Sequence, residues 1–233
     1  MKNIRFLLAA GLMLAFLSMK HSVFAQTLTP QTTVKTAEGA NDPMAHSYME
    51  KTRKWLNACK SIEIRFEACS EENNQPTPTG CQRSSLLVQG AKYRLIMGAD
   101  EFYCNGTDLW VYTIANHEVA IYACDQTLPD LNPVSLIKNH DKFYRAKYIR
   151  EQAIDGASRH IIDLTPLQRS EVTKIRIYLN KSDAKFHKIE VYLPQNRRFI
   201  YNNFSYKENA PAKAADFVFD KAKFPDVQIN DMR

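Results

Sequence analysis

Residues 101–125 read EFYCNGTDLWVYTIANHEVAIYACD and predict an antiparallel β meander. Aromatic and β-branched residues flank Asn105-Gly106, a pair that supplies the two positive-φ positions of a tight type I′ hairpin turn. A second reversal is expected at 115–117, so residues 107–113 should form a central strand that is paired on both edges. The pattern specifies β structure and is silent on function.

The same stretch resembles the core motif of a known family. Asn105-Gly106-Thr107 followed by Leu109-Trp110-Val111-Tyr112 is similar to the Asp-Gly-Lys-type turn and Leu-Trp-x-Tyr strand of the outer-membrane lipoprotein carriers, the LolA proteins. Together with further similar segments, this resemblance covers nearly all of residues 42–233. Those further segments are 162–166 (IDLTP), 195–198 (QNRR), 217–219 (FVF) and 225–227 (PDV).

The chain departs from the family pattern at one point. Many LolA proteins carry an Arg-Pro pair on an early strand, and this arginine helps to close the lid. Gln89-Gly90-Ala91 occupy those positions here, while the following Lys92-Tyr93-Arg94-Leu95 matches the next part of the pattern. Arg94 is the nearest candidate to replace the latch, but a solvated strand residue is the favoured interpretation.

The amino terminus reads as a secretory signal peptide over residues 1–25. Lys2 and Arg5 precede an apolar run over 6–17, and a small residue, Ala25, ends the segment. The run is too short to cross a bilayer core of about 30 Å. We therefore expect a cleaved signal and a periplasmic protein, with a flexible leader over 26–41 and a single domain over 42–233.

The charge balance argues against a nucleic-acid partner. Signal removal takes three of the 31 basic residues, which leaves 28 against 25 acidic ones, a net charge of +3. Basic residues are spread along the chain and never form a run of four. Such a weak, dispersed excess is not typical of nucleic-acid binding.

Five cysteines lie in a chain that we expect to be exported, where disulfides persist. Cys69–Cys81 is the favoured bridge because both residues end strands joined by a polar, Pro-rich loop over 71–80. Such a bridge would stabilise that hairpin by about 3 kcal/mol. Cys104 and Cys124 should lie two strand spacings apart, so we expect them not to bond.

Two helices are predicted beside the strands. Asp42-Pro43 is a good helix start, and apolar residues recur at helical spacing up to Cys59. A second, short helix over 131–138 begins with Asn132 as cap and Pro133. The residues alone favour ordinary packing helices, whereas the resemblance implies lids over a cavity. The lid residues would be Met44, Tyr48, Trp55, Val134, Leu136 and Ile137.

From Ser61 onward the apolar pattern has period two and indicates about a dozen strands. The predicted fold is mainly β, a single curled antiparallel sheet forming an incomplete or closed barrel of about eleven strands with helical lid segments. The predicted strands are 62–68, 83–89, 92–97, 101–104, 107–113, 118–124, 142–150, 159–164, 173–180, 186–193, 197–206 and a short one at 216–219.

A curled sheet can turn one apolar face inward, and a lipid carrier needs such a face because each exposed CH₂ of an acyl chain costs about 0.8 kcal/mol. The alternating residues can equally form a packed core. The candidate acyl-chain residues are Ile64, Phe66, Tyr93, Leu95, Trp110, Tyr112, Ile162, Leu164, Ile177, Leu179, Ile189, Val191 and Phe199.

The resemblance implies a monomeric periplasmic carrier that binds the acyl chains of lipoproteins. It would accept them from an inner-membrane release complex and pass them to an outer-membrane acceptor or to the outer membrane itself. The alternative keeps the fold and changes the role, to a periplasmic module that binds free lipid or glycolipid or senses envelope stress. The histidines are scattered, and no GxSxG, HExxH or Gly-rich phosphate loop occurs, so neither an enzyme nor a cofactor or metal site is expected.

Overall fold

The computed structural model describes residues 42–124 and 133–233. The predicted signal peptide, leader and Asn132 cap lie outside these residues. The described part contains one twelve-stranded sheet and two α-helices, so the predicted mainly β fold is confirmed. The helices are α2 (Pro43–Ala58) and α3 (Pro133–Phe143), and the strands are β1 (Ile62–Glu72), β2 (Gln75–Gln89), β3 (Lys92–Met97), β4 (Asp100–Cys104), β5 (Asp108–Thr113), β6 (Glu118–Ala123), β7 (Tyr144–Ile154), β8 (Ala157–Pro166), β9 (Lys174–Asn180), β10 (Phe186–Leu193), β11 (Arg197–Glu208) and β12 (Gln228–Asp231).

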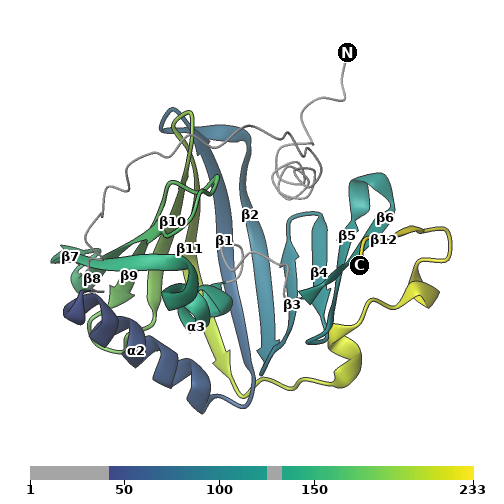
Figure 1. Cartoon of the computed structure of the whole chain (residues 1–233), viewed down its shortest axis with the longest axis horizontal. Coiled ribbons are helices and arrows are strands. Elements are labelled where there is room, and N and C mark those ends of the chain that lie inside the picture. The colour runs from purple at the N-terminus through teal and green to yellow at the C-terminus, as the bar shows by residue number, and fades with distance from the viewer. Residues whose placement is uncertain (1–41, 125–132) are drawn as a thin grey trace, which may run out of the picture. The chain divides into compact units, whose positions relative to one another are not determined.

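Most neighbouring strands of the sheet are consecutive in the chain, as in a meander (Figure 1). The exceptions are β1, which pairs with the distant β11, and the last strand, β12, which is added at the edge beside β6. The strand order is β12-β6-β5-β4-β3-β2-β1-β11-β10-β9-β8-β7, so β1 pairs with β11 across most of the chain length. The neighbours are antiparallel except for β12, which runs parallel to β6. The sheet ends at β12 and β7, and of the two predicted forms it is therefore the incomplete barrel.

The predicted Pro-rich loop over 71–80 is wrong. β1 continues to Glu72 and β2 already starts at Gln75. Only Asn73 and Asn74 turn the chain, with φ angles of 53° and 61°. Asn tolerates this left-handed region better than most residues, which permits a two-residue turn. A register shift after Cys69 accommodates the extra residues on the β2 side.

The Asn105-Gly106 hairpin is present, but its turn is not type I′. Gly106 has a φ of 100°, whereas Asn105 does not have a positive φ. The Asn105 carboxamide accepts hydrogen bonds from the backbone N–H of Thr107 and of Asp108, both at 2.8 Å. This side-chain turn needs only one residue in the left-handed region. The central strand β5 pairs with both β4 and β6 as predicted.

The carboxyl-terminal prediction also needs correction. The segment predicted as a strand over 216–219 instead overlaps the end of the short 3₁₀ helix η4 (Ala214–Phe217), and a second one, η5 (Lys221–Lys223), follows it. The last strand is β12, further along the chain. Short 3₁₀ turns let the chain bend closely around the sheet before β12 joins its edge.

The disulfides are Cys69–Cys81, as predicted, and Cys104–Cys124, which was expected not to form. Cys124 lies just past the end of β6, and its backbone N–H donates to Thr107 O at 2.8 Å. The chain thereby curls toward the β4–β5 turn, and the Cα atoms of Cys104 and Cys124 are 6.4 Å apart. Cys59 is free.

The cross-strand registers divide the sheet into two faces, because directly opposite residues point to the same side. We call one of them the helix-covered face and the other the opposite face. The helix-covered face passes through directly paired residues on both sides of the β1–β11 seam: Tyr206, Ile64, Leu86, Leu95 and Phe102 in one direction, and Tyr201, Ile189, Ile177, Ile162 and Tyr148 in the other.

Helix α2 begins as predicted and packs on this face. The Asp42 carboxylate accepts from the N–H of Met44 at 2.9 Å and of Ala45 at 3.3 Å, which caps the helix. Further along, Thr52 Oγ1 donates to Ala184 O at 2.7 Å in the β9–β10 turn. Both helices lie on the same side of the sheet in Figure 1, and they also contact each other and β7.

Candidate ligand-binding face

Most of the predicted acyl-chain residues share one face. Eleven of the thirteen lie on the helix-covered face, and most of them are fully buried. Tyr93 and Phe199 are the half-buried exceptions. The eleven are Ile64, Phe66, Tyr93, Leu95, Ile162, Leu164, Ile177, Leu179, Ile189, Val191 and Phe199.

Trp110 and Tyr112 do not belong to this group, so their assignment to a shared cavity is wrong. Leu95 pairs with Phe102, and Phe102 pairs with Val111, so these three residues lie on the helix-covered face. Trp110 and Tyr112 are the neighbours of Val111 in β5 and therefore lie on the opposite face. There Tyr112 packs in a buried cluster with Phe219 and Val227 of the carboxyl-terminal segment, and Trp110 packs against it. This segment supplies a second, separate core on the opposite face.

An aromatic row that the period-two pattern does not predict crosses the helix-covered face. The Phe66 ring centroid lies 5.5 Å from that of Tyr201 and 5.6 Å from that of Phe204. Phe204 in turn lies 5.6 Å from Phe186 and 6.2 Å from Tyr206. Such contacts give the face a wide apolar surface of flat rings.

A bulge in β11 explains the omission. The register with β1 shifts between Arg65 and Glu67, and Asn203 has a φ of 54°. Aromatic residues before the bulge are odd-numbered, and those after it, Phe204 and Tyr206, are even-numbered. A strict period of two therefore assigns Phe204 and Tyr206 to the wrong face. The Asn202-Asn203 pair was the available sequence signal of a bulge.

One polar group lies at an end of the face. At the carboxyl end of α2, Trp55 Nε1 and Lys185 Nζ both donate to the Glu208 carboxylate, at 2.8 and 2.9 Å. The Trp55 ring meets Tyr206 edge-on at 5.1 Å. Burial raises the pKa of Tyr206 well above its usual value, and its hydroxyl donates to Phe186 O at 2.9 Å.

A second polar group joins α2 to α3. Arg53 donates to Ile137 O at 3.4 Å and pairs with Asp141 at 3.5 Å, while its other nitrogen pairs with Glu50 at 3.2 Å. His140 is 2% exposed, and its Nδ1 lies 2.9 Å from Ile137 O. Burial lowers the pKa of His140, and the nearby Arg53 guanidinium lowers it further. A neutral His140 therefore donates to Ile137 O in the closed packing of the two helices.

The predicted lid residues are placed unequally. Val134, Leu136 and Ile137 are buried, and Tyr48 stacks on His160 of the sheet at 3.7 Å. Trp55 contacts the sheet as described above. Met44 is 48% exposed, because the buried side of α2 is formed by Ala45, Met49, Thr52 and Leu56. Met44 is therefore not on the packed side.

Arg94 does not replace the family latch. It lies on the opposite face, where it pairs with Glu101 at 3.1 Å and stands over the Tyr103 ring at 5.1 Å. The contact between α2 and α3 is instead made by Arg53, which no sequence motif indicated.

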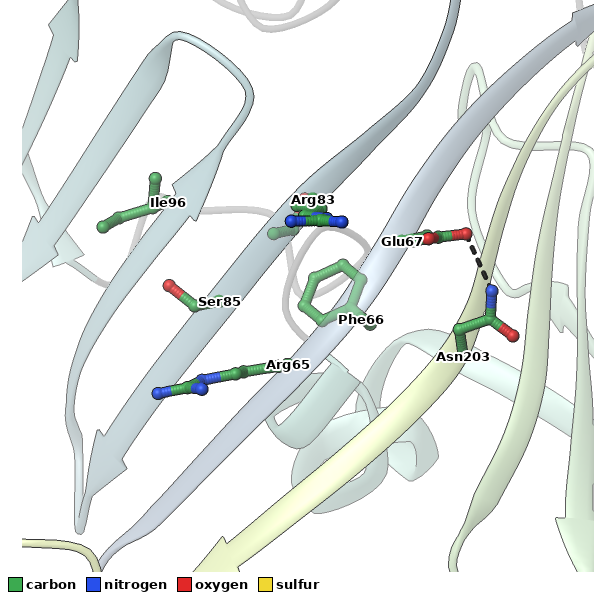
Figure 2. Close-up of a pocket in the computed structure, with 8 residues that line it drawn as sticks. Arg65, Phe66, Glu67, Arg83, Ser85, Ile96 and Asn203 are labelled. Carbon is green, nitrogen blue, oxygen red and sulfur yellow. Dashed lines mark hydrogen bonds between the residues drawn. The ribbon is translucent and has the colours of Figure 1, made fainter.

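A shallow pocket of about 320 Å³ lies over β1, β2 and β3 (Figure 2). Its lining side chains on the opposite face are mostly polar: Arg65, Glu67, Arg83, Ser85 and Ile96. Glu67 is held by the Asn203 carboxamide at 2.7 Å. This pocket does not offer the apolar surface that an acyl chain requires.

The helix-covered face thus offers broad apolar contact, interrupted by a few buried polar side chains such as Ser84 and His160. It is suited to holding a long apolar chain without chemical change. Within residues 42–124 and 133–233, no group of His, Cys, Asp and Glu is arranged to hold a metal ion. Neither described helix is long and apolar enough to cross a membrane.

One open, curled sheet with two helices over one face defines a LolA-like fold. A solved structure of an uncharacterized conserved protein from Thermus thermophilus shares the fold with a TM-score of 0.55 at 8% identity, over 81% of this chain and 99% of that one.

Two further solved structures were matched at lower TM-scores. A LolA superfamily protein from Nitrosomonas europaea gives a TM-score of 0.43 at 16% identity, over 76% and 98% of the two chains. Lipoprotein LppX from Mycobacterium tuberculosis gives 0.43 at 12% identity, over 74% and 99%. No protein-family model and no curated protein sequence matches the chain.

Proposed function

We propose that this protein is a periplasmic carrier that binds the acyl chains of lipoproteins against the helix-covered face and moves them from the inner to the outer membrane. The observation that carries the proposal is the continuous apolar face, covered in part by two amphipathic helices. The role is binding without catalysis, and the donor and acceptor would be an inner-membrane release complex and an outer-membrane receptor or lipid.

The energetics of acyl transfer support such a face. About ten exposed CH₂ groups cost about 8 kcal/mol in water. Contact with rings such as Phe66 and Phe204 removes that cost without requiring directed polar groups. The polar contacts at the ends, for example around Glu208, leave room for the lipoprotein's polypeptide to stay in water.

Because the face is buried in the structure, ligand entry requires α2 and α3 to move. Their polar attachments are few, and the central one is Arg53. The helices are therefore suited to open at a modest free-energy cost when a ligand competes for the face.

The test is native mass spectrometry of the protein purified from cells that also make a tagged lipoprotein. We expect a complex with the acylated passenger. Tyr93→Glu places a carboxylate on the helix-covered face and should weaken passenger binding by about a hundredfold. Ile96→Glu is the matched control, because Ile96 is also half-buried and lies on the opposite face of the same strand.

Three results would contradict the proposal in different ways. Recovery of free lipid alone would favour a lipid shuttle or sensor. A protein that never carries ligand would exclude the carrier role. Equal losses in Tyr93→Glu and Ile96→Glu would show that the helix-covered face is not the binding site.

A further inference from the structure

A corner of the sheet exposes two large apolar side chains next to each other. Helix α3 ends at Phe143, which is 48% exposed, and Leu167, just after β8, is 51% exposed. Leu167 N–H donates to Phe143 O at 2.9 Å, and Tyr144 pairs with Pro166. Phe143 and Leu167 therefore stand opposite each other, one step beyond the last pair of β7 and β8.

Four cations lie within a few residues of this apolar pair along the chain. We call the surface formed by Lys142, Phe143, Arg145, Lys147, Leu167 and Arg169 the β7–β8 corner, and all six residues are exposed. Tyr144 and Ala146 are buried on the helix-covered face, so the alternation of β7 directs Arg145 and Lys147 to the opposite side.

The charge of the four cations is only partly balanced, since Lys147 interacts electrostatically with the Asp42 carboxylate. None of them forms a salt bridge with any residue in 42–124 or 133–233. Two other adjacent carboxylates are engaged elsewhere, since Asp141 pairs with Arg53 at 3.5 Å and Asp163 with Arg176 at 2.6 Å. The segments 142–147 and 165–171 contain one acid, Glu171, against four cations.

We propose that the β7–β8 corner docks the protein on an anionic lipid surface. Phe143 and Leu167 would enter the boundary between headgroups and acyl chains, and the cations beside them would contact lipid phosphates. Protruding apolar side chains combined with Lys and Arg are the chemistry of interfacial membrane binding.

The shape of the surface favours a lipid over an acidic protein. A stable protein partner usually buries about 800 Å² on each side around a well-packed centre. The corner instead presents only two large apolar side chains, at the end of α3 and just after β8, which suits insertion into a fluid interface. It also lies beside the start of α2, since Tyr148 N–H donates to the Asp42 carboxylate at 3.1 Å. A docked protein would hold the ends of both helices near the lipid surface.

The test is co-flotation of the full protein with vesicles of phosphatidylcholine alone or with about one third phosphatidylglycerol. Binding should require phosphatidylglycerol and weaken with salt. The double variant F143S/L167S should bind roughly tenfold more weakly, and R145Q/K147Q should lose about fivefold per removed cation.

Matched controls are Ile114→Ser, at a residue 48% exposed in another turn, and Lys221→Gln, at an exposed lysine of the carboxyl-terminal segment. Both should bind vesicles as the wild type does. Uptake of a monomeric fluorescent fatty acid should be unchanged in F143S/L167S, which separates docking from binding on the helix-covered face.

The proposal is overturned if the folded wild-type protein ignores anionic vesicles or if the controls lose as much binding as the corner variants. It is also overturned if polyglutamate binds the protein as well as the vesicles do and F143S/L167S leaves vesicle binding intact, because that would indicate an acidic polypeptide partner.

Discussion

Arg53→Met should loosen the contact between α2 and α3. The variant keeps much of the apolar stem and removes the guanidinium that contacts Ile137 O, Asp141 and Glu50. Asp141 and Glu50 are 44% and 33% exposed, so each ion pair is worth at most about 0.5 kcal/mol. The hydrogen bond to Ile137 O is long at 3.4 Å and adds about 1 kcal/mol.

The expected loss is therefore about 1–2 kcal/mol, with no buried group left unpaired, because Ile137 O still accepts from His140. A loss of that size raises the population of helix-open molecules by about tenfold. Stopped-flow uptake of a fluorescent acyl lipopeptide should become faster by a similar factor. Chemical denaturation measures the accompanying change in the free energy of unfolding.

Lys54→Met is the matched control, because Lys54 is the next residue on α2, is exposed, and forms no salt bridge within the described residues. Its uptake rate should equal that of the wild type. If Arg53→Met loses 1–2 kcal/mol of stability but takes up ligand at the control rate, the helices do not gate the face and the reasoning fails.

Three further outcomes follow from the structure. Asp42→Ala removes the cap of α2 and should lower the free energy of unfolding by about 1–2 kcal/mol in chemical denaturation; no change would refute the capping role. Cys69→Ser with Cys81→Ser should lose about 3 kcal/mol, whereas Cys59→Ser should lose little, and equal losses would contradict the pairing. The folded-state pKa of His140 lies below 6.5, so its contribution to the free energy of unfolding should be fully present above that pH and decrease as the pH falls below it, by at most about 1.4 kcal/mol per pH unit. His140→Gln should flatten this slope, and an unchanged slope would exclude His140 as its source.

Local rules in the sequence determined much of this fold. Alternation predicted the strands and correctly placed Ile162, Leu164, Ile177 and Ile189 on a common face, because those strands are regular and pair with close neighbours. The Asp42-Pro43 start and the reversal ending at His117 also depend on residues within one turn of the chain. Such signals are complete within a short window and need no knowledge of distant contacts.

Only the tertiary structure decided which face of each strand is covered, and which segment of the chain covers it. Trp110 and Tyr112 alternate as regularly as Ile177 does, yet they face Phe219, more than a hundred residues away, because the carboxyl-terminal segment folds onto that side. A period of two identifies two faces and cannot say which of them the helices will cover. The bulge at Asn203 and the link from Arg53 to α3 likewise depend on contacts between distant segments, and local propensity does not encode such contacts.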